Sequence, residues 1–123
     1  MKVHLKLNKM KYEGFLILIK NCLNAITRTD LKSVQYRDAL FDLQTKLQGR
    51  YWNIKEKNNI TLTDMEVLAL SDMLGTLAAD FPPYDKALAY HILTEIDFQK
   101  ERHVCLLLSN LSRKMNNGQL GIE

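Results

Sequence analysis

The chain has 123 residues, of which 46% are hydrophobic and 25% are charged, and these fractions argue against a disordered chain. They fit one domain spanning residues 1–123, which is large enough to bury a core without disulfides or metals. The net charge of +3 is unevenly distributed along the chain. Residues 1–60 carry 12 basic and 5 acidic residues (+7), residues 61–100 carry 2 basic and 7 acidic residues (−5), and residues 101–123 carry 3 basic and 2 acidic residues (+1). We therefore expect a molecule with a basic and an acidic region.

The first seven residues alternate between polar and apolar side chains, with Val3, Leu5 and Leu7 apolar. A period of two is typical of a half-buried strand. A single strand needs a partner, and the only other stretch of this kind is found at residues 59–63. We therefore expect a short two-stranded ribbon between these two segments.

A first helix is predicted over residues 9–27, where apolar side chains recur at steps of three and four. Its apolar residues cover most of its circumference, which is typical of a central helix. Gly14 makes its starting point uncertain, because glycine weakens a helix. A second helix is expected after Thr29 or Asp30, either of which can cap it, with an end or a kink at Gly49.

The third predicted helix has the clearest start signal. Thr63 is followed three residues later by Glu66, which is the spacing of a capping box. Apolar residues then recur as far as Phe81. Pro82 and Pro83 end the helix, because proline cannot continue the hydrogen-bond ladder and restricts the residue before it.

A fourth helical pattern runs from Pro83 to about Gly118, and residues 118–123 are expected to form a frayed tail. Lys100 interrupts its apolar stripe, so the sequence leaves open whether residues 84–116 form one helix or two. Together these elements predict a mainly α-helical bundle of about four helices, with a short N-terminal strand pairing near residues 59–63.

No motif for catalysis, cofactor binding or metal binding is visible. The five glycines are too dispersed for a phosphate-binding loop, and no Glu-x-x-His pair occurs. His91 and Glu95 share one side of the fourth helix and His103 lies at the edge of its apolar stripe, but such an arrangement is more typical of a solvated helix face. The sequence therefore predicts a non-enzymatic protein without cofactor or metal, and leaves a ligand role for these three residues open.

Cys22 and Cys105 both lie in apolar runs, and we expect both to be small buried side chains in a reducing compartment. The first residues lack the apolar region and the cleavage site of a signal peptide. The apolar run at residues 15–19 is also far shorter than the about 20 residues that a membrane span needs. These features favour a cytoplasmic protein without membrane association.

Surplus apolar helix surface is the main functional signal, because a small monomer would struggle to bury all of it. It favours a protein that acts through protein contacts, either with itself as a homo-oligomer or with another protein. A monomer with some exposed leucines is nearly as consistent with the pattern. The candidate interface residues are Ile17, Leu18, Leu68, Met73, Leu106 and Leu108.

The alternative function is that of a small nucleic-acid-associated regulatory protein that uses the basic N-terminal half. Basic residues interleaved with aromatic ones can neutralise phosphates and stack on bases. A commoner explanation of the same segment is that its two aromatic side chains pack inward while the charges face water. The candidate contacts are Lys9, Lys11, Arg50, Tyr51, Trp52, Lys55 and Lys57.

Overall fold

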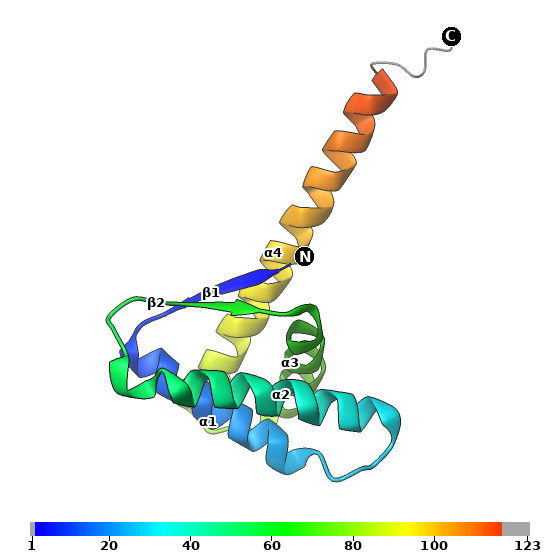
Figure 1. Cartoon of the computed structure of the whole chain (residues 1–123). Helices are drawn as coiled ribbons and strands as arrows, with labels where there is room; N and C mark the ends of the chain where they lie inside the picture. The colour runs from blue at the N-terminus through cyan, green and yellow to red at the C-terminus, as the bar shows by residue number, and fades with distance from the viewer. Residues whose placement is uncertain (1, 117–123) are drawn as a thin grey trace.

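The computed structural model describes residues 2–116 and is mainly α-helical, with a short two-stranded sheet, as the sequence predicts (Figure 1). The predicted tail at residues 118–123 lies outside the described residues. The elements are β1 (Val3–Leu7), α1 (Lys9–Ala25), α2 (Leu31–Gly49), β2 (Asn58–Leu62), α3 (Asp64–Leu77) and α4 (Pro83–Asn116). Single 3-10 turns at Tyr51–Asn53 and Ala78–Asp80 follow α2 and α3.

The ribbon predicted from the alternating pattern is present, with β1 and β2 antiparallel and Leu5 opposite Ile60. In both strands, every second side chain is buried on the face that covers the helices. The last buried position of the ribbon is polar: the side-chain amide of Asn58 donates to the carbonyls of Leu7 and Lys55, at 3.0 and 2.7 Å. These bonds tie the end of β1 to the loop that precedes β2.

Helix side chains bond the outer backbone groups of the ribbon. On β1, the carboxamide of Gln99 from α4 accepts from the His4 N–H at 2.8 Å and donates to the His4 carbonyl at 2.7 Å. On β2, the ammonium of Lys46 from α2 donates to the Thr61 carbonyl at 3.1 Å. The ribbon is therefore fastened to a helix along each of its two edges.

The helix starts follow local signals in the sequence. Asp30 accepts from the Ser33 N–H and caps α2, and Thr63 and Glu66 form the full capping box of α3. The cap of α1 was missed by the sequence reading: the side chain of Asn8 accepts from the Lys11 N–H at 2.8 Å, so the helix begins at Lys9 as expected.

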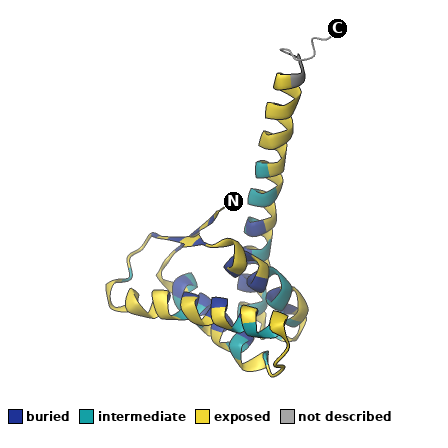
Figure 2. Cartoon of the chain, turned by 45° about the vertical axis from the view of Figure 1, so that its right-hand side comes forward, coloured by how far each residue is buried: buried dark blue, intermediate teal, exposed yellow. Residues whose placement is uncertain are grey.

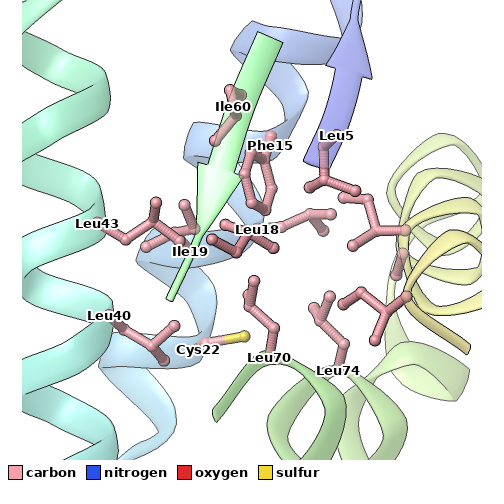
Figure 3. Packing of buried hydrophobic residues seen from close by; sticks show 14 of the residues in the cluster. Leu5, Phe15, Leu18, Ile19, Cys22, Leu40, Leu43, Ile60, Leu70 and Leu74 are labelled. Atoms are coloured by element: carbon pink, nitrogen blue, oxygen red, sulfur yellow. The ribbon is translucent and has the colours of Figure 1, made fainter. Parts of the chain in front are cut away.

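The core lies between the ribbon and the four helices, and α1 is its central element. Figure 3 shows side chains from both strands and from α1, α2 and α3 pointing into one common interior. Leu18 is fully buried there, so its prediction as an interface residue is wrong. The reason is that α1 has neighbours on most of its circumference, and only the side that carries Ile17 is left outside.

The fourth helical pattern forms one continuous helix, which answers the question of whether residues 84–116 form one helix or two. Its first half packs on the body, and its last core residue is Ile96. Its second half passes the start of β1 and then extends away from the body, where Figures 1 and 2 show it without neighbours. We call residues 101–116 the arm. Within residues 2–116, no helix combines the length and the apolar character needed to cross a membrane.

Candidate interaction surfaces

The arm exposes a stripe of apolar side chains. Val104, Leu107, Leu108 and Leu111 are each 51–59% exposed, which is unusual for four neighbouring aliphatic residues on one helix. At about 100° per residue, these four positions fall on one side of the helix, within a sector of about 100°. A stripe of this width is what a helix normally buries against another element.

The charges that flank the stripe are separated along the arm, because Arg102, which follows Glu101, lies on the other side of the helix and lines a hollow beside β1. Glu101 lies where the arm leaves the body, whereas Arg113 and Lys114 lie near its end. From Glu101 to Lys114 the helix rises about 20 Å. The stripe is thus bracketed by a negative and a positive end.

The predicted interface residues do not form one surface. Ile17 and Leu68 are about half exposed, but they lie on different helices, α1 and α3. Met73 is partly buried against the core. Leu108 belongs to the apolar stripe of the arm, whereas Leu106 points to the opposite side of α4 and lines a hollow beside β1.

The two cysteines differ, contrary to the prediction that both are buried. Cys22 lies in the core, where burial raises the pKa of its thiol to about 12. Cys105 lies on the arm and is exposed, and both thiols are free. The apolar run around Cys105 is not covered within the described chain, so its sequence context misled the prediction.

The predicted nucleic-acid contacts are partly brought together in the loop between α2 and β2. Arg50, Trp52, Lys55 and Lys57 line one hollow of about 410 Å³. Trp52 is 84% exposed, so the expectation that it packs inward is wrong. The guanidinium of Arg50 donates two bonds of 3.3 Å to one backbone carbonyl of β2, which holds it beside the loop.

The other residues of that set lie elsewhere. Lys9 lines a separate hollow together with the carboxylates of Glu13 and Glu56. The hydroxyl of Tyr51, which is half exposed, donates to Glu13 at 3.4 Å. Lys11 lines neither hollow among those described. The acidic neighbours make this second region a poor surface for phosphates.

The loop owes its shape to Asn58, which the sequence reading did not single out. Besides the two bonds it donates, its side-chain oxygen accepts from the Lys55 N–H at 3.0 Å. Asparagine favours such local turns, because its side chain can bond nearby backbone groups, and here it is the first residue of β2. It fixes the backbone between Lys55 and Lys57, and with it the position of two of the cations.

His91, Glu95 and His103 all line the hollow between α4 and β1. Their positions on α4 therefore face β1 across a hollow, whereas the sequence pattern indicated an ordinary solvated helix face. Within residues 2–116, no group of three or more histidine, cysteine, aspartate or glutamate side chains is placed to hold a metal ion. Comparisons with protein-family models, with curated proteins and with solved structures find no match for this chain.

Proposed function

We propose that this chain is a non-enzymatic helical module that acts through protein contacts, and that two copies associate through their arms. The observation that carries the proposal is the exposed stripe of Val104, Leu107, Leu108 and Leu111 on a helix that leaves the body. A helix with such a stripe is stabilised when the stripe is buried. A second copy offers a stripe of the same kind.

Charge complementarity favours an antiparallel pair. When two arms run in opposite directions, Glu101 of one copy lies opposite Lys114 of the second copy. The same register places Val104 beside Leu111 of the second copy and Leu107 beside Leu108 of the second copy. A parallel pair would instead place Glu101 beside the second copy's Glu101 and Lys114 beside the second copy's Lys114.

Light scattering over a concentration series tests the self-association. Because four side chains per copy make a small interface, we expect a dissociation constant in the micromolar range and dimers at about 500 µM. Leu107→Glu should give monomers, since it places a charge inside the stripe. Ser109→Glu is the matched control, because it adds the same charge on the opposite side of the arm and should still dimerise. A wild-type protein that stays monomeric throughout the series would rule out the proposal.

A charge-reversal pair tests the orientation. Glu101→Lys should weaken the dimer, since it places two positive groups together in the antiparallel arrangement. Adding Lys114→Glu to the same chain should restore the dimer, because the opposite charges meet again. If the double variant dimerises no better than the single one, the antiparallel orientation is wrong.

Nucleic-acid binding by the loop between α2 and β2 is the second candidate function. It is favoured by one observation, the side chain of Trp52 exposed beside Arg50, Lys55 and Lys57. An exposed indole with neighbouring cations can stack on an unpaired base while the cations neutralise phosphates. This surface is separate from the arm, so the two functions do not compete for the same residues.

Tryptophan fluorescence tests this candidate directly, because Trp52 is the only tryptophan of the chain. A single-stranded oligonucleotide should quench the emission at low salt, and the affinity should fall steeply as salt is added. Lys55→Gln with Lys57→Gln should weaken the binding, whereas Lys20→Gln, on the exposed surface of α1, should not. Absence of quenching at low salt would remove this candidate.

A further inference from the structure

The hollow between the outer edge of β1 and α4 has a volume of about 520 Å³, within the range of small-molecule sites. All three histidines of the chain, His4, His91 and His103, line it. So do the ammonium-bearing side chains of Lys2 and Lys6. Residues more than 80 positions apart in the sequence thus meet at one place, where β1 crosses α4 (Figure 1).

The secondary structure explains this gathering. The period of two places Lys2, His4 and Lys6 on one side of the strand, with about 13 Å between the first and the third. On the helix, His91, Arg102 and the residues between them at steps of three and four form the facing side. Donors therefore lie along both walls of an elongated hollow.

Among the described residues, Glu95 is the only carboxylate that lines the hollow, and it already has a partner. The Glu95 side chain accepts a bond of 2.8 Å from the Gln99 carboxamide, which is itself held by the backbone of His4. Lys2, Lys6 and Arg102 form no ion pair within residues 2–116. Three fixed positive charges therefore face one negative charge that is already hydrogen-bonded.

We propose that this hollow binds a small phosphorylated molecule. Phosphate oxygens match guanidinium, ammonium and imidazole donors, and several such donors converge here. Phe98, which is 57% exposed, and Leu106 add apolar surface to the helical wall, which suits the organic part of a phosphate ester. This site lies apart from the loop that carries Trp52 and from the apolar stripe of the arm, so it extends beyond the function proposed above.

Calorimetry with pyrophosphate as the probe tests the site. We expect one site per chain and a loss of at least about tenfold in affinity for Arg102→Gln. Arg113→Gln is the matched control, because it removes the same charge from the arm outside the hollow, and it should bind as the wild type does. Both residues are exposed, so neither change should impair folding, which circular dichroism can verify.

Nuclear magnetic resonance locates the site independently. Because every histidine lines the hollow, pyrophosphate should shift the imidazole signals, whereas sodium chloride at equal ionic strength should not. The proposal is overturned if no heat and no shifts are seen, or if Arg113→Gln weakens binding as much as Arg102→Gln, which would indicate nonspecific attraction.

A nucleoside diphosphate distinguishes the source of the phosphate. If it binds more tightly than pyrophosphate, and Phe98→Ala removes that advantage, the ligand belongs to the nucleotide class. If the two probes bind equally and Phe98→Ala changes neither, the hollow recognises the phosphate groups alone. Both results support the site, whereas tight binding of the unphosphorylated nucleoside would contradict it.

Discussion

Tyr12 shows how one polar group is accommodated in the core. Its ring is buried, and its hydroxyl donates a bond of 2.7 Å to the Leu47 carbonyl near the end of α2. Burial raises the pKa of the Tyr12 hydroxyl, while the charge of Arg50 acts in the opposite direction. The neutral, hydrogen-bonded form is therefore the one that the fold favours.

Tyr12→Phe should lower the free energy of unfolding by about 1 kcal/mol at pH 7, because it removes one buried hydrogen bond and keeps the ring. The raised pKa gives the sign of the pH dependence. The stabilisation that the Tyr12 hydroxyl contributes is fully present when the pH is below the ordinary tyrosine pKa of about 10. It is lost as the pH rises through the higher pKa of this hydroxyl in the folded state. Urea unfolding of both proteins at pH 7 and at about pH 10.5 should show the difference shrinking; a constant difference would contradict this account.

At the scale of elements, two glycines in helices have opposite surroundings. Gly14 of α1 is buried against α4, where an added Cβ would lie 2.6 Å from a methyl group of Leu88 and 3.2 Å from the ring of Tyr84. Gly75 of α3 is exposed, and apart from its chain neighbours and the backbone of its own helix, no described atom lies within 4 Å of the place an added Cβ would take. Gly14 permits a close approach of two helices. Gly75 lowers helix stability and permits no such contact.

Gly75→Ala should stabilise the protein by about 0.5–1 kcal/mol, since alanine is the better helix former and meets open space. Gly14→Leu should destabilise it by about 1–3 kcal/mol, because the larger side chain forces α1 and α4 apart. Thermal or urea unfolding measures both changes. Equal effects of the two substitutions would show that the contact between α1 and α4 is not as close as described.

On the scale of the whole molecule, the body and the arm depend on different contacts. Every residue of the core cluster lies at or before Ile96, whereas residues 104–114 are exposed throughout. Few buried contacts mean that the arm can open locally without unfolding the body. In a single copy, the arm amides are protected only by the hydrogen bonds of their own helix.

The rate of amide hydrogen exchange should therefore depend on protein concentration in the arm alone. At about 1 µM, where monomers dominate, residues 104–114 should exchange quickly, and at about 500 µM the pairing of arms should slow them. The amides of α1 should be protected equally at both concentrations. With Leu107→Glu, the arm should exchange quickly at either concentration. An arm that is equally protected in the wild type at both concentrations would contradict pairing.

Local signals made most of the fold predictable. The alternation in the first seven residues and the spacing of Thr63 and Glu66 act within a few positions, so they can be interpreted without knowing the tertiary contacts. Asn8, which caps α1, is a local signal of the same kind. The end of α3 was predicted less well: the α-helix ends at Leu77, before the expected stop at Pro82 and Pro83, and a 3-10 turn at Ala78–Asp80 lies between.

Placement of the sites was less predictable, because it depends on neighbours that are distant in sequence. Two adjacent residues of α1 differ in burial: Leu18 is buried in the core, whereas Ile17 is about half exposed. The apolar and aromatic residues next to Cys105 and Trp52 suggest that both side chains are buried. Both are exposed, because no described element covers the arm or the loop. The meeting of His4 with His91 likewise depends on where β1 crosses α4.

The side chains that bond the outer backbone groups of the ribbon affect how readily the protein aggregates at high concentration. A two-stranded sheet has two open edges, and an open edge is a template on which a strand of another molecule can add, the first step of fibrous aggregation. Here Gln99 occupies both backbone groups of His4 on one edge, while Lys46 and Arg50 occupy carbonyls on the other. An incoming strand would have to displace all three, so concentrated solutions of this chain should favour closed helical pairs over growing sheets.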